Sequence, residues 1–156
     1  MQLTLEWERP LDLVDGSAEN LIYSLDAERL PHAAGIYVFG RVHGGAFEAL
    51  YVGKAGNLAG RVAGQLNNLR LMNHVRNART GTRILLSARI VTRQGQQERR
   101  VLDVVEKAFI KFFLSAGHDL VNKQGARIRR HEIGSRRRPR VASIPKSVYV
   151  ERGRGE

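Results

Sequence analysis

The stretch GIYVFGRVHGGAFEALYVGKA, residues 35–55, decides the fold that we expect for this chain. Residues 35–40 and 46–53 are rich in β-branched and aromatic side chains, which favour strands. The polar run between them ends in Gly44 and Gly45, and glycine readily adopts the positive φ that a tight turn needs. The stretch therefore predicts a β-hairpin.

The predicted hairpin decides where its tyrosines point. Alternate residues of a strand face opposite sides of the sheet, so Tyr37 and Tyr51 lie close together on one face if the strands pair across the glycine turn. Asn57 is placed to cap the helix that follows, because an asparagine side chain accepts a hydrogen bond from a first-turn amide. Arg61 then lies about one turn into that helix, within reach of the same face.

Three later segments complete the predicted fold. Residues 57–71 carry apolar side chains at helical spacing, and residues 83–92 form a strand that adds to the hairpin sheet. Residues 97–116 form a strong amphipathic helix, which Gly117 ends in the C′ position. We therefore expect an α+β fold with a small antiparallel sheet of about three central strands, the first two a hairpin, flanked by helices.

The two hairpin strands carry a recognisable pair of motifs. Gly35-Ile36-Tyr37 and Tyr51-Val52-Gly53 resemble the two short strand motifs that name the GIY-YIG nuclease family, with valine for isoleucine in the second. Three further positions fit that family in order and spacing: Arg61, which lies ten residues after Tyr51, Glu106 and Asn122. The resemblance covers roughly residues 31–123 and implies a GIY-YIG-like fold.

The resemblance implies a divalent-metal-dependent DNA endonuclease that hydrolyses phosphodiester bonds with one Mg²⁺ or Mn²⁺ ion. It implies that Glu106 holds the metal, that Arg61 binds the scissile phosphate and that Asn122 supports the metal site. Lys54 matches a position that is often lysine in the family, where it either lowers the pKa of a tyrosine or contacts phosphate. Because Mg²⁺ keeps much of its water shell, one glutamate is enough, and Asp103, one turn earlier, is not required.

The general base is open at this point. By resemblance, Tyr37 and Tyr51 position or deprotonate the nucleophilic water, and a phenol with a pKa of about 10 needs a nearby cation to ionise at neutral pH. Many family members have a histidine or tyrosine one helical turn after the arginine, whereas this chain has Gln65, which is not a base. The other conceivable bases are three histidines: His74, His118 and His131.

Composition limits the class of protein. The chain has 156 residues, the size of one domain, and a formal net charge of +11, which favours a polyanionic partner such as nucleic acid. It has no cysteine, so disulfides and thiolate metal sites are excluded. No apolar run approaches the ~20 residues that span a bilayer, and no secretory signal is visible at the N-terminus. We therefore expect a single cytoplasmic domain over residues 1–156, with no membrane partner.

The N-terminal part of the chain is acidic. Residues 1–34 contain seven acidic residues against two arginines, and we expect this extension (about residues 1–30) to lie away from a nucleic-acid-binding face. Leu3, Leu5 and Trp7 alternate with polar residues within it, which is typical of an edge strand. Trp7 is either a stacking platform for a base or, as we favour, a core anchor.

The C-terminal part is basic. We expect residues 124–156 to form an arginine-rich arm that binds the backbone of double-stranded DNA, because arginine clusters bind phosphate with little choice of sequence. Residues 127–140 hold seven arginines against one glutamate, namely Arg127, Arg129, Arg130, Arg136, Arg137, Arg138 and Arg140. Lys54 and Arg61 are the other expected nucleic-acid contacts.

Two alternatives to a nuclease remain. One is a catalytically weak or inactive nucleic-acid-binding protein on the same scaffold, which Gln65 favours. The other is a basic RNA-binding or ribosomal protein, which would need neither the hairpin tyrosines nor the helix glutamate. The sequence also leaves open a homodimer or a protein partner.

Overall fold

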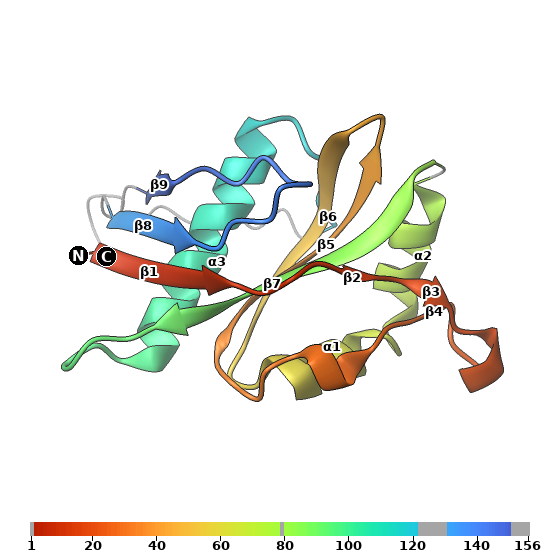
Figure 1. Cartoon of the computed structure of the whole chain (residues 1–156), viewed down its shortest axis with the longest axis horizontal. Coiled ribbons are helices and arrows are strands. Elements are labelled where there is room, and N and C mark those ends of the chain that lie inside the picture. Colours follow the sequence, from red (N-terminus) through yellow and green to blue (C-terminus); the bar gives the residue numbers. More distant parts are fainter. Residues whose placement is uncertain (1, 79, 122–130, 151–156) are drawn as a thin grey trace.

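We analysed a computed structural model that describes residues 2–78, 80–121 and 131–150, with the backbone alone at positions 131, 149 and 150. The described chain forms a curved seven-stranded sheet with helices on both faces (Figure 1). None of its helices is long and apolar enough to cross a membrane.

The predicted hairpin is confirmed. Strand β5 (Gly35–His43) pairs antiparallel with β6 (Ala46–Ala55), from Gly35 opposite Ala55 to His43 opposite Ala46. The two turn residues, Gly44 and Gly45, have φ values of 58° and 78°. A two-residue turn with positive φ at both positions matches the twist of the flanking strands, so the glycine pair sets the register next to the turn. A β-bulge between Phe39 and Gly40 then shifts the register by one residue, so that Tyr37 and Tyr51 come to the same face.

Strand β7 (Thr82–Val91) lies in the middle of the sheet. One of its edges pairs antiparallel with β5 over eight residue positions. Its other edge is shared by β1 (Gln2–Trp7), which pairs with the end of β7, and by β2 (Leu11–Asp12), which pairs near its start. The N-terminal segment therefore extends the hairpin sheet on the side away from β6.

The sheet is larger and less regular than the sequence predicted. Strand β8 (His131–Arg136) pairs parallel with β1, and β9 (Ser147–Val150) pairs antiparallel with β8, so the strand order is β6-β5-β7-β1-β8-β9. The expected small antiparallel sheet of about three strands is wrong, because the real sheet is mixed. Two short strands, β3 (Val14–Asp15) and β4 (Tyr23–Ser24), form a separate hairpin.

The N-terminal strand shows the physical reason for this error. The alternation of Leu3, Leu5 and Trp7 does form a strand, but β1 lies between β7 and β8 and is not an edge strand. Its partner β8 lies more than 120 residues later in the chain. Local periodicity reports the conformation of a segment, not the identity of a distant partner.

Helices cover the two faces of the sheet. Helix α3 (Glu98–Ser115) packs on the face of Ile36 and Val38, and its apolar side chains join the larger hydrophobic cluster. Helices α1 (Leu58–Gln65) and α2 (Leu69–Asn77) pack on the opposite face, together with Tyr37 and Phe39 (Figure 1). Two 3₁₀ turns, η1 (Ser17–Glu19) and η2 (Ala27–Arg29), precede the hairpin.

The helix predicted over residues 57–71 is two helices. The chain leaves helical geometry between α1 and α2, and the Asn68 side chain caps the second helix by accepting a hydrogen bond from the Leu71 amide at 3.2 Å. Asparagine stabilises a helix N-terminus more than a helix interior, which explains the break at this position.

Helix α3 ends as predicted. Gly117 has a φ of 85°, and the amides of Gly117 and His118 donate to the carbonyls of Leu114 and Phe113 at 3.1 and 3.0 Å. This pair of bonds is the Schellman arrangement, in which a left-handed residue closes the helix. It directs His118 toward β6.

Candidate active site

The two hairpin tyrosines lie side by side, as the sequence predicted. Tyr37 is opposite Gly53 and Tyr51 is opposite Phe39, so the two phenols are diagonal neighbours on one face of the β5–β6 pair. Their ring centroids are 6.0 Å apart, with an angle of 27° between the ring planes. The diagonal position brings both hydroxyls to the same end of the cluster that α1 covers.

Gly53 makes room for the phenol of Tyr37. A Cβ atom at position 53 would overlap the hydroxyl end of the Tyr37 ring, which is fully buried. A methyl group here must therefore displace either the ring or the strand. The glycine of the second motif is thus explained by close packing and not by backbone conformation.

Gly53→Ala is expected to lower the free energy of unfolding by about 1–3 kcal/mol, because overpacking in a filled core forces side chains off their preferred positions. Chemical denaturation measures this change. Gly64→Ala, on α1, is the matched control: a Cβ there meets nothing, so alanine should stabilise the helix by up to about 1 kcal/mol. Equal effects at the two positions would contradict the packing role of Gly53.

Gln65 joins the two tyrosines. Its Nε2 donates to the hydroxyl of Tyr37 at 2.7 Å and to the hydroxyl of Tyr51 at 3.3 Å. Its Oε1 accepts from Nδ2 of Asn68 at 3.0 Å, and the side chain is buried. Gln65, which stands where many GIY-YIG nucleases have a histidine or tyrosine, therefore uses both its amide nitrogen and its amide oxygen in hydrogen bonds and orients both phenols.

Arg61 lies on the solvent side of the same cluster. Asn57 caps α1 by accepting from the Gly60 amide at 3.2 Å, and Arg61 lies one residue further along the first turn. The guanidinium donates to the hydroxyl of Tyr37, and this bond raises the pKa of Arg61, with smaller contributions from Tyr51 and Glu106. An exposed guanidinium that its hydrogen bond to Tyr37 orients is well placed to bind an anion.

Tyr37 is poorly suited to lose its proton. Burial raises its pKa from 10.0 to about 12, although the hydrogen bonds from Gln65 and Arg61 act in the opposite direction. A charged phenolate loses hydration in the core, and the two donors recover only part of that loss. At neutral pH, Tyr37 is therefore a neutral hydroxyl.

The raised pKa makes stability depend on pH. Since the folded state holds the Tyr37 proton more tightly than an unfolded chain, stability present below pH 10 is lost as the pH rises through 12. We expect this loss to be about 2–3 kcal/mol, and Tyr37→Phe should flatten the decline. Denaturation curves measured between pH 9 and pH 12 test it. Parallel declines in the two proteins would contradict the assignment.

Lys54 connects the hairpin to α3. At the end of β6, its ammonium forms a close ion pair with Oδ1 of Asp103 and lies 3.4 Å from Oε1 of Glu106. The hydrogen bond to Asp103 is the main reason that the pKa of Lys54 is raised, and the charge of Glu106 adds to it. Lys54 is therefore a cation at neutral pH and not a general base.

Glu106 is accessible from solvent. Its side chain is 21 % exposed on the edge of the apolar stripe of α3. Asp103 lies one helical turn earlier on the same side of the helix. The family resemblance assigns no role to Asp103, but its spacing of three from Glu106 is the signal in the sequence for a pair of carboxylates on one helix face.

The two carboxylates are chemically suited to a divalent cation. Hard cations such as Mg²⁺ prefer carboxylate oxygens and need few protein ligands. Asp103 and Glu106 supply such oxygens beside a partly exposed surface. Among the described residues no group of three or more His, Asp or Glu side chains gathers as a metal site.

The other predicted bases lie elsewhere. Nδ1 of His118 accepts a hydrogen bond from the Ala49 amide at 2.7 Å, and burial lowers the pKa of this imidazole. Nε2 of His74 contacts the carbonyl of Asp119 at 3.1 Å. Neither imidazole contacts the tyrosines, and the side chain of His131 lies outside the described part of the chain.

Part of the predicted site also lies outside the described residues, namely Asn122, Arg127, Arg129 and Arg130. Within the described part, Arg136 ends β8 and Arg140 is exposed. Arg137 pairs with Glu6 at 2.7 Å, and Arg138 donates to the carbonyl of Ile144 at 3.3 Å. The acidic N-terminal strand therefore lies against the arginines that it was expected to avoid.

Comparisons of the chain with protein-family models, curated proteins and solved structures find no match.

Proposed function

We propose that this protein is a divalent-metal-dependent DNA endonuclease that hydrolyses phosphodiester bonds at the cluster of Tyr37, Tyr51, Arg61 and Glu106. One observation carries the proposal. The exposed Arg61 bonds to the buried phenol of Tyr37 and lies close enough to Tyr51 and Glu106 for both to act on its pKa, so four residues that span seventy positions of sequence lie near one another. That combination of groups meets the needs of phosphodiester cleavage better than those of a structural core.

Arg61 is the proposed phosphate ligand. Its guanidinium is planar, permanently charged and exposed, and it matches the geometry of phosphoryl oxygens. The hydrogen bond to Tyr37 and the cap at Asn57 hold it in place before the substrate binds. Such preorganised charge stabilises a transition state without reorganisation during the reaction.

Glu106 is the proposed metal ligand, with Asp103 beside it. A bound Mg²⁺ would supply charge neutralisation at the phosphoryl and departing oxygens. Lys54 now lies against both carboxylates, so it reduces their mutual repulsion and keeps them on one side of α3. The ammonium also places a positive charge next to the path of the incoming phosphate.

The two phenols have different surroundings. Tyr37 is fully buried with a raised pKa, so in the proposal it orients Arg61 through its hydroxyl. Tyr51 is half-buried and receives only the longer, 3.3 Å bond from Gln65. Its hydroxyl is therefore the better candidate to hold the attacking water.

A plasmid assay tests the proposal. Supercoiled DNA is incubated with the protein in Mg²⁺ or Mn²⁺, and parallel reactions contain EDTA. Nicked or linear product that depends on the metal supports the endonuclease. Stable DNA binding without any product, at every metal concentration, would instead support the non-catalytic alternative.

One observation favours that alternative as a second candidate. Gln65 occupies the position where a base is common in the family. The nitrogen of its side-chain amide bonds to the tyrosines, and the oxygen accepts from Asn68. A binding protein would need the basic surface but not Glu106. A cytoplasmic location remains a prediction from the sequence.

A further inference from the structure

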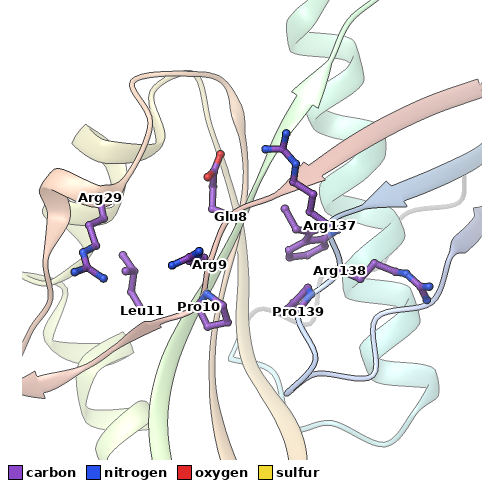
Figure 2. A pocket seen from close by; sticks show the side chains of 9 residues that line it. Glu8, Arg9, Pro10, Leu11, Arg29, Arg137, Arg138 and Pro139 are labelled. Atoms are coloured by element: carbon purple, nitrogen blue, oxygen red, sulfur yellow. The ribbon is translucent and has the colours of Figure 1, made fainter.

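A second hollow, of about 560 Å³, lies apart from the tyrosine cluster. Its walls come from the end of β1 and the loop that follows it, from η2, and from the turn after β8 (Figure 2). Four exposed arginines line it: Arg9, Arg29, Arg137 and Arg138. Its volume is within the range of about 300–1,000 Å³ that is usual for ligand pockets.

The pocket keeps an excess of positive charge. Arg29 pairs with Asp26 at 3.1 Å, and Arg137 pairs with Glu6 at 2.7 Å. Glu6 and Glu8 both contact Arg89, at 3.1 and 3.0 Å. These five guanidinium groups and three carboxylates leave two positive charges uncompensated. Within the described part of the chain, the side chain of Arg9 has no acidic partner.

The pocket wall after β8 has an unusual backbone. Arg137 has a φ of 51°, in the left-handed region that side chains other than glycine and asparagine seldom adopt. This bend holds Arg137 on Glu6 and lets Arg138 donate to the Ile144 carbonyl. A costly conformation that presents two adjacent arginines is more often retained for binding than for packing.

The pocket is a neighbour of the candidate active site. The amide of Glu8 donates to the carbonyl of Ser87 at 2.9 Å, and Ser87 pairs with Tyr37 across β5 and β7. On the other side, the amide of Ala59 donates to the carbonyl of Pro31 at 3.2 Å, which joins α1 to the segment after η2. One strand and one helical turn therefore separate the two sites.

The pocket is suited to phosphate and not to bases. Trp7 lies in its floor with only 1 % of its surface exposed, and it packs edge-on against Phe109 at 5.7 Å. The indole is therefore a core anchor, as the sequence favoured, and offers no face for stacking. With the indole excluded, the exposed guanidinium groups of the arginines are the binding groups of the pocket, and guanidinium groups recognise phosphoryl oxygens.

We propose that this arginine pocket binds phosphodiester groups of the same DNA molecule that the candidate active site cleaves, away from the scissile bond. That the ligand is DNA follows from the proposed function. That the ligand carries phosphate follows from the arginines that line the pocket. Arg9 and Arg29 supply the contacts on the side of the tyrosine cluster. The pocket adds affinity and orients the duplex, without reading its sequence.

The test measures binding in EDTA, so that cleavage plays no part. Anisotropy of a labelled duplex is followed over a series of salt concentrations for wild type and for Arg9→Ala/Arg29→Ala, two exposed positions whose loss leaves the core intact. We expect about tenfold weaker binding and a smaller salt slope, by about one to two, because each lost phosphate contact removes about 0.9 from the slope.

Arg70→Ala/Arg93→Ala is the matched control. It removes the same charge at exposed positions that lack an acidic partner in the described chain. Equal losses of affinity in the two double variants would overturn the proposed phosphate site, since net charge alone would explain them. An unchanged salt slope in Arg9→Ala/Arg29→Ala, or a wild-type protein that binds no duplex, would also overturn it. A selective loss without any plasmid cleavage would support the pocket and reject only the nuclease.

Discussion

Glu106→Gln is expected to reduce metal-dependent DNA cleavage about a thousandfold, the largest effect that the site predicts. The Glu106 carboxylate is partly exposed, lies 3.4 Å from the Lys54 ammonium and acts on the pKa of Arg61, and glutamine keeps its size while removing the charge. A metal held mainly by this group would lose several kcal/mol of its interaction, and about 1.4 kcal/mol corresponds to a factor of ten in rate. Initial nicking rates over a range of Mg²⁺ concentrations measure the change.

Glu98→Gln is the matched control for this experiment. Glu98 is exposed in the first turn of the same helix, and its loss should cost only a few tenths of a kcal/mol through the helix dipole. Both variants should unfold within about 1 kcal/mol of wild type, because the Lys54–Glu106 pair is partly solvated. If Glu106→Gln cleaved DNA at the wild-type rate, Glu106 would have no metal role and the nuclease proposal would fail.

Arg61→Ala is expected to lower the cleavage rate by about a hundredfold to a thousandfold, the second largest effect. Loss of one preorganised charge that faces the reacting oxygens typically has this size. The expected reduction lies in the maximal rate more than in DNA affinity, because the proposed backbone contacts of the pocket arginines are unchanged in this variant. Single-turnover rates at saturating protein separate the two quantities.

Arg61→Lys distinguishes a bound phosphate from a positive charge of any kind. Lysine keeps the charge but cannot make two parallel bonds to a phosphoryl group. We expect lysine to recover only part of the rate, because neither variant keeps the guanidinium that bonds to Tyr37. Full activity in Arg61→Ala would contradict the proposed role, and full recovery in Arg61→Lys would show that bidentate geometry is unimportant.

Much of the local structure could be predicted from the sequence, because it depends on residues close together in the chain. The paired glycines at 44 and 45 required a two-residue turn, and so the antiparallel hairpin of β5 and β6. The apolar period of α3 and the glycine after it were equally explicit. For the turn, the helix and the end of the helix, the residues that form the structure are the same residues that predict it.

The sheet could not be predicted in this way. The parallel pairing of β1 with β8 joins the two ends of the described chain, and no local pattern in Leu3, Leu5 or Trp7 names that partner. The same pairing brought Glu6 to Arg137 and so changed an acidic extension and a basic arm into two walls of one pocket. Counting the charges of each segment separately cannot predict that a glutamate of one segment will pair with an arginine of another.

The same distinction between local sequence and tertiary packing applies to the candidate site. Sequence alone determined the hairpin and the helix that carries Glu106, because backbone propensity and side-chain period are local properties. The two phenols share a face of the hairpin only because the β-bulge between Phe39 and Gly40 shifts the register by one residue. Only the tertiary structure decided that Gln65 bonds to both phenols, that Lys54 contacts both Asp103 and Glu106, and that arginines from distant segments line one pocket. Those contacts join segments that packing brings together, and their energies depend on distance and burial, which exist only in the folded chain.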